Sequence, residues 1–339
     1  MTGFLRNCWY MAAWSEELGD APLGRKLLGE QVVLYRGTDG RAIAMAGVCP
    51  HRFAPLSMGK VHGDDIACPY HGLRFSPQGA CTHSPFGVEV PPATVLRAYP
   101  LLERDDCLWI WMGDADKADE SLVPDFAYHV DPALRVVRGA SHIACNYELV
   151  TDNLMDLTHA RFLHPIFGGD DWQPTVSFSQ DGDTVFSHYS LPAYPSSPFS
   201  DAMMAQAKGR MIEEREFMRW QAPANMYLDI QFSVIDEPGL GEVPQPSTHI
   251  LTPETDGTTH YFWASGIPAD ADMTDEDHYA GLRFAFDEED APVLEGVGRM
   301  MEGRDFWDMK PAILPFDQGG IRARRILRQK IRAEQTAAD

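Results

Sequence analysis

Two histidines and two side chains with amide or carboxylate oxygens lie close together in the middle of the chain. These four residues are Asn153, Asp156, His159 and His164. If the stretch is helical, the first three project from one face, because they are three residues apart. His164 follows His159 by five residues, so we expect the helix to end or bulge after Arg161, and Pro165 supports such a stop.

Two imidazoles that meet a carboxylate from elsewhere in the chain would form a facial site for non-haem Fe(II), which keeps coordination positions open for dioxygen. The alternative is an ordinary helix whose two histidines only pack and form hydrogen bonds. The stretch by itself leaves both interpretations open, and the other motifs of the chain decide between them.

Two further pairs of metal-ligand residues lie earlier in the chain. Cys49 and His51 form a Cys-x-His pair, and Cys68 and His71 form a Cys-x-x-His pair. Thiolates and imidazoles bind zinc or an iron–sulfur cluster. Zinc modules usually take two cysteines from one loop and two histidines from the other, whereas each loop here supplies one of each. That distribution favours a Rieske [2Fe–2S] centre, in which two cysteines hold one iron and two histidines the other, with zinc as the alternative.

These two sets of residues need two different scaffolds. From residue 1 to 115, short apolar runs such as 31–35 and 42–45 alternate with Gly, Pro and Asp, which predicts an all-β domain. Residues 116–124 are acidic and rich in turn formers, so we interpret them as a linker. From 125 to 339, strand-like runs are followed by helical ones, and this order predicts an α+β domain.

The composition restricts the classes of function. With 339 residues, the chain is long enough for two domains. Its formal net charge of −22 argues against nucleic acids and anionic membranes as partners. No apolar run is long enough to span a bilayer, and the N-terminus lacks the pattern of a signal peptide. The six cysteines include two in a metal-type spacing, which favours a reducing cytoplasm over a disulfide framework.

Together, the two motifs resemble those of the Rieske non-haem iron oxygenases, whose oxygenase subunits carry a cluster domain followed by an iron domain. Residues 49–71 are similar to the family's cluster ligands, and residues 153–164 are similar to its Asn-x-x-Asp-x-x-His-x-x-x-x-His sequence. Neither ligand loop has the additional cysteine of the respiratory Rieske proteins. Within the family, the chain resembles the branch of vanillate and dicamba O-demethylases. Segments typical of that branch are 6–10, 152–156, 249–255 and 317–324.

This resemblance implies a role for each residue of the iron site. The expected residues are Asn153, Asp156, His159, His164 and Asp290. The histidines are ligands, Asn153 lies beside the iron, and Asp156 is a bridge to another subunit rather than a ligand. The third ligand of the family is a distant aspartate, and Asp290 is expected because an apolar stretch and a glutamate follow it. Asp287 is the weaker candidate, and these acids could instead only begin a solvated helix.

The family fold is a curved antiparallel sheet around a helix, of the helix-grip or START-like kind, with the iron in a pocket between them. In that pocket, His249 matches a histidine that helps to hold the substrate's polar end in the dicamba enzyme. That enzyme also has an asparagine on the strand where this chain offers Asp229 and Gln231, so we expect these two to contact the substrate. Residues 165–171 and 194–211 are candidates for a pocket lid.

The resemblance also implies the reaction and its participants. The family uses O2 and electrons from NADH, which arrive through a ferredoxin or a reductase, and no dinucleotide-binding fingerprint is apparent in this chain. The branch predicts a monooxygenase that oxidatively demethylates a methoxylated aromatic acid to a phenol and formaldehyde. The alternatives are N-dealkylation or aryl-methyl hydroxylation of another aromatic substrate, and a Rieske electron carrier without oxygenase activity.

The family further implies a homotrimer with head-to-tail contacts, in which Asp156 accepts a hydrogen bond from His71 of the partner subunit. An acidic chain also needs a local basic patch to bind an acidic electron donor. Arg52 and Arg74 flank the cluster loops, and residues 321–332 form a basic segment with an apolar stripe. We expect this segment to form a helix that lies either at the donor's binding site or packed at a subunit edge.

Overall fold

The computed structural model describes residues 3–167, 174–237, 243–269 and 271–338 of the chain. Contacts between residues divide the chain into two compact units. The first consists of Phe4–Pro124 with Thr252–Thr255, and the second of Met1–Gly3, Asp125–Leu251 and Asp256–Asp339. Residues 116–124, expected as a linker, thus belong to the first unit by their contacts, and they contain the 3-10 helix η5 (Glu120–Leu122).

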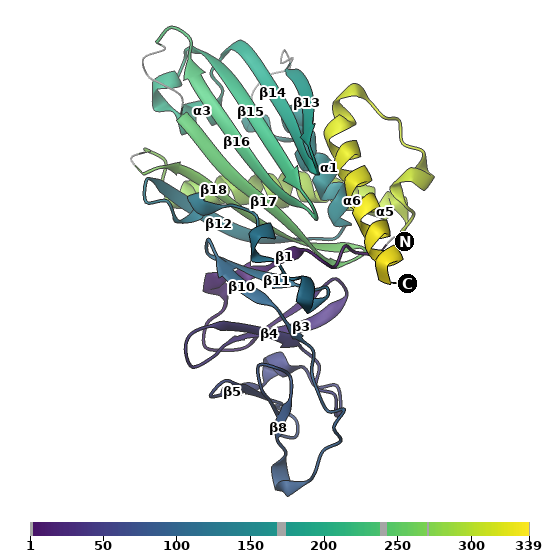
Figure 1. Cartoon of the computed structure of the whole chain (residues 1–339). Helices are drawn as coiled ribbons and strands as arrows, with labels where there is room; N and C mark the ends of the chain where they lie inside the picture. Colours follow the sequence, from purple (N-terminus) through teal and green to yellow (C-terminus); the bar gives the residue numbers. More distant parts are fainter. Residues whose placement is uncertain (1–2, 168–173, 238–242, 270, 339) are drawn as a thin grey trace. The chain divides into compact units, whose positions relative to one another are not determined.

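The first unit is built from three small antiparallel sheets, with strand orders β1-β11-β10, β2-β3-β4-β9 and β5-β6-β7-β8 (Figure 1). Its strands are β1 (Trp9–Trp14), β2 (Leu23–Leu27), β3 (Glu30–Arg36), β4 (Ala42–Ala46), β5 (Lys60–His62), β6 (Asp65–Ala67), β7 (Arg74–Phe75), β8 (Cys81–His83), β9 (Ala98–Tyr99), β10 (Leu101–Arg104) and β11 (Cys107–Trp111). Apolar side chains form two cores, one around Tyr10 and Leu108 and the other around Val33 and Phe75. The prediction of an all-β N-terminal domain is confirmed.

The second unit contains one antiparallel sheet of seven strands among the described residues, in the order β12-β18-β17-β16-β15-β14-β13. These strands are β12 (Leu134–Ile143), β13 (Thr175–Asp181), β14 (Thr184–Pro195), β15 (Met211–Gln221), β16 (Asn225–Val234), β17 (Val243–Thr255) and β18 (Thr258–Pro268). In β15 and β16, buried residues alternate with half-buried ones, because successive side chains of a strand point to opposite faces. One face of the sheet is therefore available to line an enclosed site.

Helices pack against this sheet, which bends around them in Figure 1. They are α1 (Tyr147–Met155), α2 (Ala160–Leu163), α3 (Pro198–Met203), α4 (Asp275–Arg283), α5 (Ala291–Met301) and α6 (Gln318–Ala338). A π-helical segment, Phe284–Asp290, joins α4 to α5, so that residues 275–301 form one continuous helical stretch. The predicted α+β unit with a curved antiparallel sheet around a helix is confirmed.

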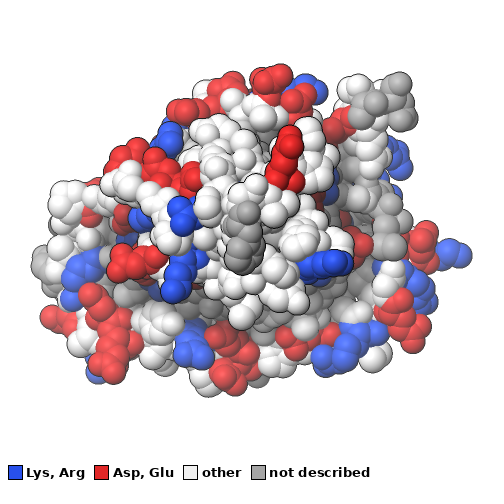
Figure 2. Space-filling model, turned by 90° about the horizontal axis from the view of Figure 1, so that it is seen from below, with Lys and Arg blue, Asp and Glu red and all other residues white. Residues whose placement is uncertain are grey.

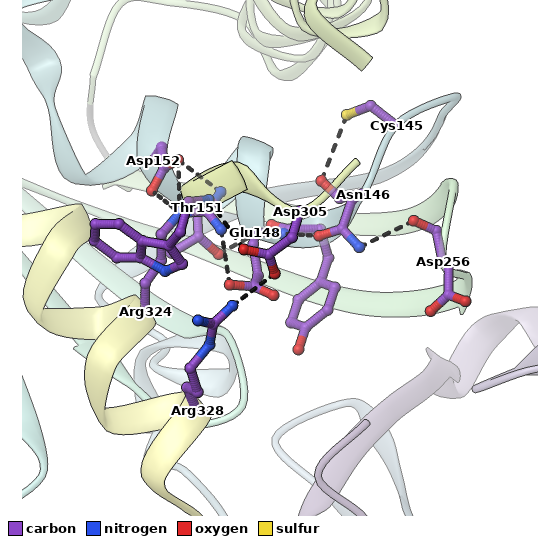
Figure 3. Close-up of polar contacts among 11 residues, drawn as sticks. Cys145, Asn146, Glu148, Thr151, Asp152, Asp256, Asp305, Arg324 and Arg328 are labelled. Carbon is purple, nitrogen blue, oxygen red and sulfur yellow. Dashed lines mark hydrogen bonds and ion pairs between the residues drawn. The ribbon is translucent and has the colours of Figure 1, made fainter. Parts of the chain in front are cut away.

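Helix α6 is anchored to α1 by buried charges. Arg324 is only 6% exposed, and its guanidinium lies 2.7 Å from Asp152 and 2.8 Å from Glu148 on α1 (Figure 3). One turn further along, Arg328 contacts Asp305 at 2.6 Å. Removing one partner of a buried ion pair leaves an uncompensated charge, so these contacts strongly favour one position of α1. That position matters because the end of α1 begins the iron-site motif.

Candidate active site

The iron-site motif begins where helix α1 ends. The last residue of α1 is Met155, and Asp156 has non-helical backbone angles (φ −127°, ψ 89°). The Asp156 carboxylate accepts hydrogen bonds from the backbone N–H and the hydroxyl of Thr158, at 3.0 and 2.7 Å, and so caps a new turn. The prediction that Asn153, Asp156 and His159 share one helix face is therefore wrong, because the helix stops at the middle residue of the three.

Three side chains from two distant segments converge on one point. Helix α2 ends at Leu163, as predicted, so that His164 leaves the helical phase of His159. The Nε2 atom of each histidine lies 3.5 Å from the same oxygen, Oδ1 of Asp290. Among the described residues, only these three donors form a group whose metal-ligand atoms all lie within 4.8 Å of one another. Neighbouring ligands of an octahedral metal are roughly 3 Å apart, so a small movement would close this group around one ion.

The other nitrogen of each ring is held by the protein. His159 Nδ1 lies 2.6 Å from the backbone carbonyl of Asp156, and His164 Nδ1 lies 2.7 Å from a carboxylate oxygen of Glu289. Both partners can only accept, so each Nδ1 carries the proton and each Nε2 presents a lone pair to the ion. Glu289 was not among the expected site residues, although it lies directly before the expected third ligand.

Asp290 is the last residue of the π-helical segment. Pro292 lies in the first turn of α5 and lacks the N–H that a regular helix would use there, which accounts for the wider turn before it. As a result, two consecutive residues, Glu289 and Asp290, both face His164. The π-helical turn thus brings one candidate ligand, Asp290, to the site together with Glu289, the group that orients a second candidate, His164.

Asp290, and not Asp287, is brought to the two histidines. Asp287 pairs with Arg283 at 3.2 Å. Asn153 donates from Nδ2 to Asp290 Oδ1 at 3.3 Å, which places it beside the point where the three donors meet. Burial raises the pKa of Asp290, against the opposing effect of both histidines, and burial lowers the pKa of His159. A bound cation would stabilise this buried carboxylate, so the donor set fits a divalent metal.

The four predicted cluster residues lie on two loops with the same backbone path. In one loop the N–H of Phe53 donates to the carbonyl of Cys49 at 2.9 Å, and in the other the N–H of Gly72 donates to the carbonyl of Cys68 at 3.1 Å. Phe53 and Gly72 both have positive φ, 59° and 72°. The two loops therefore present their cysteines in equivalent positions.

The cysteines of this set are buried and the histidines are exposed. Cys49 and Cys68 are 1% and 4% exposed, whereas the rings of His51 and His71 are open to solvent, with centroids 4.6 Å apart. Burial raises the pKa of Cys49 to about 11. No three of these four donors lie within 4.8 Å of one another, although the ligands of a tetrahedral zinc are roughly 3.8 Å apart or closer. The spread fits a two-iron cluster better than a single zinc ion.

An apolar cavity of about 210 Å³ borders the three iron-site donors. Its walls include Leu154, Phe167, Phe199, Leu228, Leu282 and Phe286. Phe167 and Phe199 come from the two predicted lid segments, and their rings pack with centroids 4.5 Å apart. Residues 168–171 of the first of these segments lie outside the described residues. The cavity has the character of a site for a small aromatic molecule, with hydrophobic walls and few polar groups.

His249 lines this cavity, where the resemblance places it. Its Nδ1 lies 2.6 Å from the hydroxyl of Tyr261, and burial raises the pKa of that phenol well above its ordinary value. Tyr261 and His249 are therefore joined by a hydrogen bond in which the tautomer of the ring decides which group donates. Burial lowers the pKa of His249 to about 3, so the ring is neutral. Its Nε2 has no hydrogen-bond partner in the described part of the chain.

Asp229 and Gln231 do not line the cavity, and the expectation that they contact the substrate is corrected. Their neighbours Leu228 and Ile230 face it instead, since side chains alternate along β16. Gln231 donates to the carboxylate of Asp229 at 2.7 Å on the opposite face of the sheet. The strand was identified correctly, but a shift of one residue exchanges the two faces.

Two buried glutamates were missed by the sequence analysis. Glu214 and Glu216 are 1% and 3% exposed on the inner face of β15, and Glu216 lines the cavity. Burial raises the pKa of both carboxyl groups, and the neighbouring Glu214 raises that of Glu216 further. The hydroxyl of Tyr194 donates to Glu214. The alternation of buried residues from Ile212 to Trp220 is the signal that could have revealed them.

A second, wider recess of about 540 Å³ also reaches the iron-site residues. Its polar walls include Asn153, Asp156, His159 and Asp317. Its apolar walls include Leu294, Val297, Met301 and Phe306. The recess therefore brings a carboxylate, Asp156, to an apolar surface within reach of another molecule.

The surface of the molecule carries both signs of charge. On the face drawn in Figure 2, acidic and basic side chains are interspersed around an area with few charges. Within the described ranges, no helix is both long enough and apolar enough to cross a membrane. The six cysteines form no disulfide.

Two family models match the chain, and they correspond to its two units. The Rieske [2Fe-2S] domain matches residues 8–100, and the vanillate O-demethylase oxygenase C-terminal domain matches residues 143–333. The first includes both cluster loops. The second includes the histidines and the aspartate of the iron site.

Individual relatives match along nearly the whole chain. The oxygenase component of dicamba O-demethylase from Stenotrophomonas maltophilia is 36% identical over 95% of this chain and 96% of its own. The oxygenase component of chloroacetanilide N-alkylformylase from Rhizorhabdus wittichii is 36% identical over 98% of this chain and 97% of its own. A solved structure of dicamba monooxygenase with non-haem iron and dicamba is 34% identical, covers 98% of this chain and 99% of its own, and has a TM-score of 0.84.

The cofactors follow from these matches. The Rieske domain binds a [2Fe–2S] cluster, and the iron domain binds a mononuclear non-haem iron. The donors described above fit both groups: two buried thiols and two exposed imidazoles for the cluster, and two imidazoles and a carboxylate for the iron. A Rieske electron carrier without a second iron site is thereby excluded. The chain belongs to the Rieske non-haem iron oxygenases, as the oxygenase component of a system to which other proteins supply electrons.

Proposed function

We propose that the chain oxidatively demethylates a methoxylated aromatic acid and releases a phenol and formaldehyde. The observation that carries this proposal is the apolar cavity that is lined by the iron-site donors and by His249. The family and two of its members with O-demethylase activity support the same reaction. The cavity volume of about 210 Å³ suits one substituted ring.

In this proposal, His159, His164 and Asp290 hold the mononuclear iron, and Cys49, His51, Cys68 and His71 hold the cluster. The iron, when bound, supplies the activation of dioxygen with electrons from the cluster. The chain itself positions the substrate and excludes water from the cavity. Phe167, Phe199 and Phe286 exclude water from the ring of the substrate, and His249 orients its carboxylate.

A second candidate reaction is oxidative N-dealkylation, and one observation favours it. The chloroacetanilide N-alkylformylase component is as similar to this chain as the dicamba component is, at 36% identity each. N-dealkylation would use the same iron site and would also release an aldehyde, so only the fit of the substrate separates the two reactions.

The test is a screen of the iron-replete protein with a surrogate reductase, NADH and O2. Methoxybenzoic acids and N-methyl anilides are compared, and formaldehyde and oxygen consumption are measured. The proposal predicts formaldehyde from at least one methoxybenzoic acid, in a one-to-one ratio with the oxygen consumed. Formaldehyde from the anilides alone would replace the first candidate by the second.

We also propose a head-to-tail homotrimer, in which the cluster tip of one chain enters the wider recess of the next. The tip is apolar and carries exposed imidazoles, with Phe53 and Tyr70 77% and 65% exposed beside the ligands. The recess offers apolar walls and the Asp156 carboxylate. In this arrangement, Asp156 accepts a hydrogen bond from His71 of the partner subunit, and a ring closes because the contact is heterologous.

The electron donor, a ferredoxin or a reductase, is proposed to bind near the exposed arginines of α6. Arg324 is buried and Arg328 is paired, so they are part of the internal structure of the second unit. Arg325 and Arg332 are exposed and remain available to an acidic partner. A ferredoxin or reductase as the donor is consistent with a cytoplasmic protein. The absence of disulfides among the six cysteines of this chain is consistent with the same location.

A further inference from the structure

A break in the helical path lies directly before the first histidine of the iron site. Helix α1 ends at Met155, a 3-10 turn begins at Leu157, and Asp156 lies between them with non-helical backbone angles. In a continuous α-helix, the carbonyl of Met155 would accept from the N–H four residues later, and the N–H of Leu157 would donate to the carbonyl four residues earlier. The break removes both hydrogen bonds, so two buried residues have backbone groups that need other partners.

One side chain of the sheet supplies both missing partners. The hydroxyl of Tyr189 on β14 accepts a hydrogen bond from the N–H of Leu157 at 3.0 Å and donates one to the carbonyl of Met155, also at 3.0 Å. An amide N–H can only donate and a carbonyl oxygen can only accept, so a hydroxyl suits this pair of groups. Tyr189 is 1% exposed, which keeps water from taking its place.

The carbonyl of Met155 has a second donor. Ser187, two residues before Tyr189 on the same face of β14, donates from its hydroxyl to this carbonyl at 3.1 Å. Gly319 at the start of α6 lies against the same point, because a Cβ at this position would clash with the hydroxyl oxygen of Ser187. Strand β14, the start of α6 and the end of α1 therefore meet at one peptide group.

The hydrogen bonds of Tyr189 determine where the residue between them lies. Asp156 has both of its neighbours in the chain bound to one hydroxyl, so its own peptide groups have little freedom to rotate. The carbonyl of Asp156 lies 2.6 Å from Nδ1 of His159, and Nε2 of the same ring lies 3.5 Å from Asp290. A short series of contacts thus connects Tyr189 to the donors of the iron site.

We propose that Tyr189 is a positioning residue of the iron site, and that its hydroxyl keeps the backbone of Asp156, and through it the ring of His159, in place. Loss of the hydroxyl weakens iron binding, because it releases the carbonyl that orients His159. It also displaces the carboxylate of Asp156. The effect on electron transfer rests on the proposed contact of Asp156 with a partner subunit, whereas the effect on iron binding does not.

The test compares Tyr189→Phe with Ser187→Ala. Each substitution removes one buried hydroxyl that donates to the carbonyl of Met155, and each leaves the other hydroxyl as a donor. Only Tyr189→Phe also removes the acceptor of the Leu157 N–H. Ser187→Ala is therefore the matched control for the loss of a buried hydroxyl at this point.

The first measurement is hydrogen–deuterium exchange of the full-length, cluster-containing protein, with peptides that include Leu157 analysed by mass spectrometry. We expect the amide of Leu157 to exchange about tenfold faster in Tyr189→Phe, because its N–H has lost its acceptor, and at an unchanged rate in Ser187→Ala. Peptides from β16 and from the cluster loops should exchange equally in all three proteins. That result would exclude a general loss of structure.

The second measurement is the affinity for Fe(II), determined by competition with a chelator. Tyr189→Phe should weaken iron binding about tenfold, whereas Ser187→Ala should leave it unchanged. The Rieske signal on reduction should be the same in both variants, because the cluster loops belong to the other unit. A merely structural role of Tyr189 would lower the stability to unfolding and leave the iron affinity of the folded protein unchanged.

An unchanged iron affinity of Tyr189→Phe would overturn the proposal, and so would an unchanged exchange rate of the Leu157 amide. An unprotected Leu157 amide in the unmodified protein would also overturn it, and this measurement needs no variant, so it holds even if a substitution prevents folding. If Tyr189→Phe weakens iron binding while Asp156→Asn shows normal turnover, Tyr189 remains a positioning residue of His159 and only the proposed bridge fails.

Discussion

The two metal-binding regions of this chain use histidine in opposite ways. At the cluster loops, the histidine rings are exposed and the cysteines are buried, so the imidazole edges face outward. At the iron site, His164 and Asp290 are each 5% exposed, and both histidines have their second nitrogen fixed by the protein. The first arrangement suits a centre that passes electrons to another molecule. The second suits a centre that must keep water away from a reactive intermediate.

The comparison also shows where each region obtains its rigidity. The cluster loops are fixed locally, because each contains a hydrogen-bonded turn. In each turn, the backbone carbonyl of the cysteine accepts a hydrogen bond from a residue with positive φ. The iron site joins residues that are far apart in the sequence and depends on the end of α1, on a π-helical turn and on the anchoring of α6. A substitution remote from the iron site should therefore disturb it more easily than one remote from the cluster.

The largest effect is expected at the carboxylate of the iron site. Asp290→Ala removes one of three ligands, so the protein should retain two irons per chain instead of three and lose all demethylation, while the Rieske signal on reduction persists. Iron analysis and electron paramagnetic resonance measure both. Asp287→Ala is the matched control and should keep three irons; the opposite result would exchange the roles of these aspartates.

The link between the two regions should be next in magnitude. Asp156→Asn is expected to keep both metals and to lower coupled turnover about a hundredfold, because it removes the carboxylate proposed to join the two centres. Single-turnover kinetics of the prereduced protein would measure the transfer. Thr158→Val removes only a hydrogen bond to Asp156 and should have a much smaller effect. Normal turnover of Asp156→Asn contradicts the bridge.

Orientation of a single ligand should have an intermediate effect. Glu289→Gln replaces the carboxylate that fixes His164 and should weaken iron binding about tenfold to a hundredfold. The affinity for iron is measured by competition with a chelator, during which the loss of iron from the protein is monitored. The exposed neighbour Glu288→Gln is the control. An unchanged iron affinity for Glu289→Gln would mean that His164 is oriented by packing alone.

The smallest effect is expected at the surface. Arg325→Glu should raise the Michaelis constant for the electron donor by about threefold at low ionic strength and leave that for the aromatic substrate unchanged, because exposed charges mainly change association. The difference should disappear at high salt. If the Michaelis constant for the electron donor is unchanged in the variant, α6 has only a structural role.

The sequence was most informative where a ligand spacing is short and local. Cys49 and His51, or His159 and His164, are close enough in the chain for their types and spacing to indicate a metal. The break of α1 at Asp156 was not predictable from spacing, because residues at intervals of three look helical until the cap is known. Asp290 was found only through the family pattern, since nothing local distinguishes it from Asp287.

The substrate cavity was the least predictable part. Leu228 and Asp229 are adjacent, and only the register of β16 decides which of them faces the cavity. Glu214 and Glu216 stand out only after β15 is recognised as a strand whose other inner-face residues are apolar.

The central claim is that electrons pass from the cluster of one chain to the iron of the next, and mixed assemblies test it most directly. Cys68→Ser chains, which lack the cluster, and Asp290→Ala chains, which lack the iron, are co-expressed with different tags and purified as mixed oligomers. Each variant alone should be inactive. The account predicts that the purified mixed trimers recover about a third of the unmodified activity, because one of the three head-to-tail junctions in each pairs a cluster with an iron. Mixed assemblies that contain both chains and show no activity would contradict it.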